Sequence, residues 1–135
     1  MALETKKLQG LLQHILAAHP AVKLGILFGS CARGDQRRDS DLDLAVAGEK
    51  ALEIEQRIRV MEDLAMATAS PIDLVDLQAA RIPVLRQTLT TGKLVCCKDR
   101  RLYAEIIKRM LFEEADFMPY RRRILQERRR AWINN

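Results

Sequence analysis

Hydrophobic residues recur along this chain with two different periods, which predict helices alternating with short strands. Leucine, isoleucine and related residues follow the spacing of an amphipathic helix at residues 3–19, 49–68, 80–89 and from residue 101 onward. Compact apolar runs that are typical of strands cover residues 22–28, 72–77 and 93–97. The helix at 49–68 is expected to bury a stripe formed by Leu52, Ile58, Met61, Leu64 and Ala65. A last, basic helix is expected at residues 121–132, after the break at Pro119.

Residues 41–46 alternate between two kinds of side chain, as a strand does when it buries one face. Leu42, Leu44 and Val46 fall on one face, and Asp41, Asp43 and Ala45 fall on the other. Since the apolar face must pack on the core, the two aspartates are expected to project together from the opposite face.

These elements predict a single α/β (α+β) domain over residues 1–135, in which helices and about four short strands form two layers. The expected core spans residues 20–97, and a basic helical region follows at residues 100–135. The pattern does not specify the order or direction of the strands.

Composition and cysteine usage restrict the class of protein. With 48% hydrophobic and 30% charged residues, the chain fits a globular protein and not a disordered one. No segment approaches the roughly 20 apolar residues that cross a bilayer, and no secretory signal follows Met1. Cys31, Cys96 and Cys97 lack metal-site spacing, and an odd number with a vicinal pair suits reduced thiols. We therefore expect a cytoplasmic protein that does not bind membranes.

Candidate chemistry is concentrated around Asp41 and Asp43. Two carboxylates on one face of a strand repel each other and attract a cation, and oxygen ligands of this kind suit Mg²⁺. Taken alone, such a pair is more often a solvated strand face. Here, however, it follows a turn at Gly29 and Ser30, where backbone N–H groups and the serine hydroxyl can cradle a phosphate. Glycine leaves room for that phosphate, and Arg33 could reach the same anion.

A third carboxylate would complete a two-metal site. The strand at residues 72–77 offers Asp73 and Asp76, which lie on opposite faces, so at most one of them belongs to the site. Asp73 comes early in the strand and fits better. Asp76 is expected to end the strand or to cap the next element.

The run GSCARGDQRRDSDLDLAV and the later PIDLVDL resemble the minimal nucleotidyltransferases of the DNA polymerase β-type superfamily, over residues 22–97. The resemblance implies a small mixed sheet flanked by helices, with ATP as substrate and two Mg²⁺ ions. By position in the motif it implies that Asp41, Asp43 and Asp73 are catalytic and bind metal, and that Asp73 helps to deprotonate the attacking hydroxyl. The expected nucleotide-binding residues are Gly29, Ser30, Arg33 and Ser40.

The resemblance also implies a partner. Many minimal nucleotidyltransferases are antitoxins that transfer AMP from ATP to a tyrosine of a HEPN ribonuclease toxin, in a hetero-oligomer. Two alternatives remain: an antitoxin that masks its partner without transferring anything, and a nucleotidyltransferase that acts on a small molecule. On the antitoxin hypothesis, residues 1–97 alone should keep the nucleotide-binding fold and lose the partner.

The net charge of +5 lies entirely at the C-terminal end, where 11 Lys or Arg face 6 Asp or Glu from residue 98 onward. Arg triplets at residues 121–123 and 128–130 could bind nucleic acid, but few aromatic residues lie nearby to stack on bases. We favour a solvated or partner-binding surface, with nucleic-acid binding as the alternative. An apolar set that fits either a partner helix or the protein's own sheet consists of Tyr103, Met110, Phe117, Met118 and Trp132.

Overall fold

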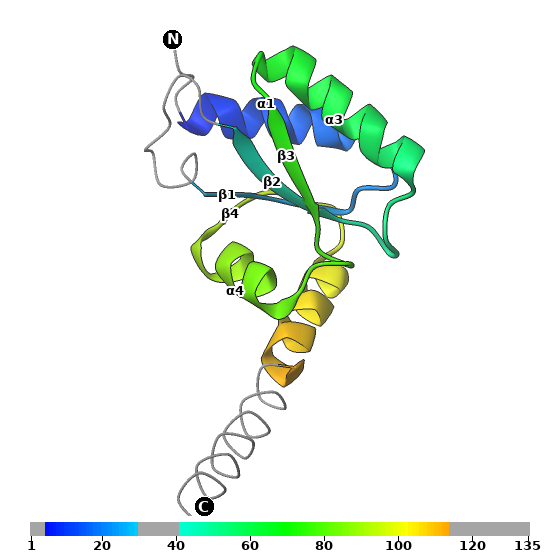
Figure 1. Ribbon diagram of the computed structural model, residues 1–135, viewed down its shortest axis with the longest axis vertical. Helices are drawn as coiled ribbons and strands as arrows, with labels where there is room; N and C mark the ends of the chain where they lie inside the picture. Colours follow the sequence, from blue (N-terminus) through cyan, green and yellow to red (C-terminus); the bar gives the residue numbers. More distant parts are fainter. Residues whose placement is uncertain (1–4, 30–40, 114–135) are drawn as a thin grey trace, which may run out of the picture.

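The computed structural model of the protein describes residues 5–29 and 41–113, and in these ranges helices and strands follow one another in the expected order (Figure 1). The elements are α1 (Thr5–Ala17), β1 (Leu24–Phe28), β2 (Leu42–Ala47), α3 (Ile54–Thr68), β3 (Ile72–Asp76), α4 (Ile82–Thr91) and β4 (Lys93–Cys97). Another helix begins at residue 100 and is described as far as residue 113. The basic helix expected at residues 121–132 lies outside the described residues. In the part of the chain that the structure describes, no helix is long and apolar enough to cross a membrane.

The four strands form one mixed sheet in the order β3-β2-β1-β4. β1 pairs antiparallel with both β2 and β4, whereas β2 and β3 run parallel. As a result, the end of β1 and the starts of β2 and β3 meet at the same end of the sheet. The expectation of a small mixed sheet flanked by helices is confirmed.

Helices cover both faces of this sheet, so the two-layer arrangement expected from the sequence is wrong. α1 and α3 lie on one face, and α4 and helix 100–113 lie on the other (Figure 1). The first core joins α1 and α3 to the sheet and includes Leu8, Leu12, Leu16, Leu27, Leu42, Leu44, Val46, Val60 and Leu64. The second core lies beneath α4 and helix 100–113 and comprises Leu24, Ile26, Phe28, Ala45, Ala47, Leu77, Leu85, Leu102, Ile106 and Met110. Because a strand buried on both faces can carry small alanines on one of them, Ala45 did not mark a solvated face.

The first turn of the helix expected at residues 49–68 is instead a loop. Helix α3 begins at Ile54, since the preceding loop is tied to the end of β3: the Leu52 N–H donates to Asp76 Oδ2 at 2.7 Å. The Glu53 N–H then donates to Gln56 Oε1 at 3.1 Å, which caps the helix. Leu64 of the expected stripe is fully buried, but Ile58 is 47% exposed, so this part of the stripe was wrong.

Helix 100–113 is an integral part of the fold. Leu102, Ile106 and Met110 are buried in the second core, and Tyr103 packs against it. Arg109 anchors the helix by donating hydrogen bonds to the backbone oxygen of Leu77 and, at 3.0 Å, to Gln78 Oε1.

The members of the predicted apolar set that lie in the described residues are therefore directed inward. Tyr103 and Met110 face the protein's own sheet, whereas Phe117, Met118, Trp132 and the Arg triplets lie outside the described residues. A chain cut after residue 97 would uncover the second core. The expectation that such a fragment keeps the fold is not supported, and single substitutions are the better test of partner binding.

The C-cap of α3 is Ala69, which has a left-handed backbone with φ 53° and ψ 32°. Glycine favours this conformation, whereas a Cβ there costs about 1–2 kcal/mol. We expect Ala69→Gly to raise the free energy of unfolding by about 1 kcal/mol, measured by urea denaturation. A decrease would contradict the assignment of strain to this residue.

Candidate active site

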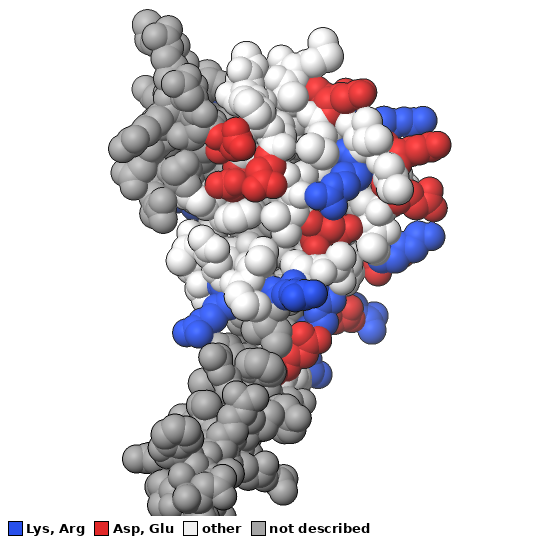
Figure 2. All heavy atoms as spheres, in the orientation of Figure 1, with Lys and Arg blue, Asp and Glu red and all other residues white. Residues whose placement is uncertain are grey.

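Three aspartates lie at the end of the sheet where β1 ends and β2 and β3 begin. Asp41 directly precedes β2, Asp43 is the second residue of β2, and Asp73 is the second residue of β3. Asp43 and Asp73 are paired in the parallel register, so both side chains leave the sheet on the same face. Figure 2 shows acidic side chains gathered on the visible surface at this end of the sheet.

Asp73 lies beside Asp43 on the neighbouring strand, close enough for its carboxyl group to act on that of Asp43. The pKa of Asp43 is raised above its ordinary value of 3.8, first by burial, then by the charge of Asp73, the hydrogen bond to Asp73 and the charge of Asp41. All four contributions act in the same direction. The carboxylates in this part of the site therefore repel one another, so that binding of a proton or a cation is favoured.

The same face of β2 continues into the second core. Asp43 shares its face with Ala45 and Ala47, which are fully buried. Asp43 itself is half-buried, and Asp73 is exposed. The pair thus stands at the border between a packed core and solvent. The sequence pattern predicted the shared face but missed the core beside it.

Gly29 follows the last residue of β1 and contacts Asp43. Its φ of +73° lies in the left-handed region, and a Cβ placed on it would meet Oδ2 of Asp43 and lie 3.0 Å from Cγ. The glycine was expected at this turn because a phosphate needs room there. The structure shows in addition that a carboxylate already occupies the space where a side chain would start.

Asp76 has a different role from Asp73, as its place at the end of β3 suggested. It is buried, with 7% of its surface exposed. Its Oδ2 accepts the Leu52 N–H at 2.7 Å, and its Oδ1 accepts the Gln78 N–H at 2.9 Å. Both oxygens are engaged with the backbone, so Asp76 joins the β2–α3 loop to the turn after β3 and is not oriented toward Asp43.

The described residues fit a metal site built on two carboxylates. No group of three or more His, Cys, Asp or Glu side chains within residues 5–29 and 41–113 is arranged to hold a metal ion. Asp41 contributes charge to Asp43 but does not complete such a group. Mg²⁺ usually takes only one or two carboxylates and fills its shell with water and substrate phosphate, so the Asp43–Asp73 pair suits this ion. Ser30, Arg33 and Ser40 lie outside the described residues.

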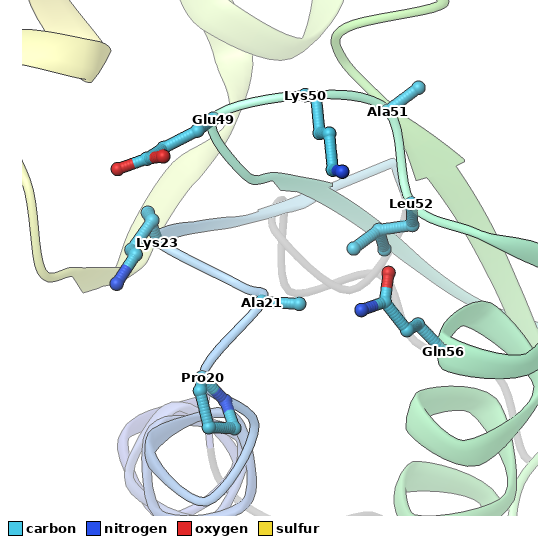
Figure 3. Close-up of a pocket in the computed structure, with 8 residues that line it drawn as sticks. All are labelled: Pro20, Ala21, Lys23, Glu49, Lys50, Ala51, Leu52 and Gln56. Carbon is cyan, nitrogen blue, oxygen red and sulfur yellow. The ribbon is translucent and has the colours of Figure 1, made fainter.

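A hollow of about 690 Å³ lies at the opposite end of the sheet, between the segment before β1 and the β2–α3 loop. Figure 3 shows Lys50, Leu52 and Gln56 turned toward it, with Pro20 and Ala21 across from them. Its lining does not include Asp41, Asp43 or Asp73. The hollow is therefore separate from the three aspartates.

The raised pKa of Asp43 predicts how stability depends on pH. A carboxyl with a raised folded-state pKa binds its proton more tightly in the folded chain, so the unfolding free energy falls as pH rises from 3.8 through the folded pKa. With EDTA present, we expect Asp43→Asn to have a higher Tm than the wild type at pH 7. That difference should shrink as the pH falls toward 3.8. A lower Tm of the variant at pH 7, or a difference independent of pH, would contradict this electrostatic account.

Asp73 and Asp76 provide a matched pair of substitutions on one strand. Asp76→Asn replaces an acceptor of two backbone N–H groups, and we expect it to lower the free energy of unfolding by about 1–3 kcal/mol. Asp73→Asn relieves the repulsion with Asp43, so it should leave stability unchanged or raise it in metal-free buffer. Urea denaturation at pH 7 makes the comparison, and equal losses for the two variants would refute the separation of roles.

Comparison with known proteins connects this geometry to a family. Residues 11–101 match the family model described as Polymerase beta, Nucleotidyltransferase. The protein adenylyltransferase MntA of Shewanella oneidensis is 40% identical over 74 residues, which is 55% of this chain and 53% of MntA. The aligned part thus spans only about half the length of this curated relative.

Solved structures share the fold over more of the chain. A chain of a toxin–antitoxin crystallised with AMP-PNP is 28% identical, with a TM-score of 0.74, over 88% of this chain and 96% of that chain. A complex of tri-AMPylated Shewanella oneidensis HEPN toxin with MNT antitoxin matches at 23% identity with a TM-score of 0.71, over 92% of this chain and 98% of that chain, which shows the fold alone. The family match covers Gly29 and all three aspartates. The chain therefore belongs to the polymerase beta, nucleotidyltransferase family.

Proposed function

We propose that this chain is a Mg²⁺-dependent protein adenylyltransferase, and that it acts as the antitoxin of a toxin–antitoxin pair by transferring AMP from ATP to a tyrosine of a HEPN ribonuclease. The observation that carries the proposal is the pairing of Asp43 with Asp73 on neighbouring strands, beside Gly29 and within the region that matches the family. The names of the relatives support the acceptor class, since one is a protein adenylyltransferase and another is part of a toxin–antitoxin with AMP-PNP.

Asp43 and Asp73 would hold Mg²⁺, with Asp41 adding negative charge from the start of β2. When bound, the ion would neutralise the phosphate oxygens and the leaving pyrophosphate. Gly29 stands at the end of β1 next to this pair. By analogy with the family motif, Gly29 and Ser30, with Arg33 and Ser40, would hold the triphosphate.

The exposed position of Asp73 suits it to meet the incoming hydroxyl. The tyrosine oxygen would attack the α-phosphorus of ATP and form a new P–O bond. The bond from that phosphorus to the β-phosphate oxygen would break, and pyrophosphate would leave with the electron pair. The hydroxyl proton would pass to the carboxylate of Asp73, which is more exposed than Asp43.

Transfer of AMP explains how such an enzyme could silence a ribonuclease. The new phosphodiester places a negative charge and a nucleoside at the modified tyrosine. Because RNA binding depends on attraction between basic residues and the phosphate backbone, an added anion near an RNA-binding surface weakens it. The same chemistry on a small molecule would lack this consequence.

The test incubates the chain with ATP labelled at the α-phosphate and the product of the neighbouring gene, which the proposal expects to be a HEPN protein. We expect label on that protein that survives denaturation, and Asp43→Asn and Asp73→Asn should each lower the rate at least about 100-fold, which corresponds to about 2.7 kcal/mol. Glu55→Gln, which removes an exposed carboxylate from α3, is the matched control and should keep the wild-type rate.

The outcome separates the remaining alternatives. Binding of the HEPN protein without label transfer would favour an antitoxin that masks its partner. Label that appears only on an added small molecule would favour small-molecule nucleotidylation. Either result would overturn the proposal.

A further inference from the structure

Gly29 and Asp43 are packed against each other on neighbouring strands. Phe28, the last residue of β1, is directly opposite Asp43 of β2 in the antiparallel register. Gly29 follows with a φ of +73°. A Cβ on residue 29 would meet Asp43 Oδ2 and lie 3.0 Å from Cγ and 3.2 Å from Cβ of Asp43. The aspartate carboxylate therefore fills the space that a side chain at residue 29 would need.

We infer that Gly29 is a positioning residue for Asp43: its missing side chain leaves the space that Asp43 Oδ2 occupies on the β1 side, while Asp73 lies on the β3 side of the same aspartate. This role goes beyond that of a glycine that makes room for phosphate, since the contact exists within the protein itself. Its consequence for metal binding rests on the proposed function.

Backbone conformation alone does not explain the need for glycine at residue 29. Ala69 adopts a left-handed conformation in the same chain, with φ 53°. Alanine is thus tolerated in this region of backbone space where no atom obstructs its Cβ. What distinguishes residue 29 is the carboxylate of Asp43, because any Cβ there forces the carboxylate or the turn to move.

A Cβ at residue 29 would force the Asp43 carboxylate out of its present position beside Asp73. The second core fixes the adjacent part of the face through Ala45 and Phe28, which are both buried, so the β2 backbone cannot easily shift to compensate. The change would therefore act on the Asp43 side chain, and through it on a metal that both carboxylates hold. Loss of a residue that orients a metal ligand typically lowers metal affinity about 10–100-fold.

A double-mutant cycle on thermal stability tests the contact without any metal or partner. We expect Gly29→Ala to lower the Tm by more than Ala69→Gly raises it, since the second substitution reports the left-handed penalty of an alanine in this chain. In the Asp43→Ala background, where the obstructing Cγ and Oδ2 are absent, the Tm loss from Gly29→Ala should fall to half or less. Gly10→Ala is the control, because a Cβ on Gly10 of α1 meets nothing within 4 Å. Equal Tm losses from Gly29→Ala in the two backgrounds would overturn the inference.

Manganese binding, followed by electron paramagnetic resonance with and without AMP-PNP, tests the consequence at the site. We expect Gly29→Ala, at a temperature where it is folded by circular dichroism, to bind Mn²⁺ about tenfold more weakly than the wild type, while Gly10→Ala binds normally. Unchanged Mn²⁺ affinity with a loss confined to AMP-PNP would assign Gly29 to the phosphate and overturn the positioning role. If the wild type bound neither Mn²⁺ nor AMP-PNP, the proposed function would fail, and the stability cycle would still decide the Gly29–Asp43 contact.

Discussion

The pairing of Asp43 with Asp73 on neighbouring strands is the constraint on which the arrangement of the candidate site depends. Two like charges are held together because β2 and β3 are paired in register at these residues. The neighbours of Asp43 on its strand, Leu42 and Leu44, are 1% and 0% exposed. Burying a leucine contributes about 1.5–3 kcal/mol, and a slip of one residue would turn both leucines to the other face. The hydrophobic cores thus hold a pair of carboxylates that would separate in a flexible loop.

The two ends of the sheet have different roles. At one end, the turn that follows β1 and the starts of β2 and β3 bring together Gly29, Asp43 and Asp73. At the other end, Asp76 binds the backbone of Leu52 and Gln78, and the side chain of Gln78 accepts a hydrogen bond from Arg109. This network fastens helix 100–113 and the β2–α3 loop to the sheet. Asp76, whose two carboxylate oxygens both accept hydrogen bonds, stabilises the fold. At the opposite end, the repulsion between Asp43 and Asp73 remains.

Much of the site followed from the sequence because strand periodicity is a local property. The alternation of residues 41–46 predicted that Asp41 and Asp43 share a face, and spacing alone separated Asp73 from Asp76. Features that depend on tertiary packing were missed. Ala45 looked compatible with a solvated face, but α4 and helix 100–113 cover it. The late start of α3 depends on a hydrogen bond from Leu52 to Asp76, and the contact of Gly29 with Asp43 requires the β1–β2 register, which no local pattern contains.

The central claim is that the Asp43–Asp73 pair binds the divalent ion that accompanies ATP. A crystal structure of the chain grown with Mn²⁺ and AMP-PNP, with diffraction recorded at the manganese absorption edge, tests it most directly. The account predicts an anomalous peak roughly 2.0–2.2 Å from carboxylate oxygens of both residues and in contact with the nucleotide phosphates. A bound nucleotide with no anomalous density between Asp43 and Asp73 would contradict it.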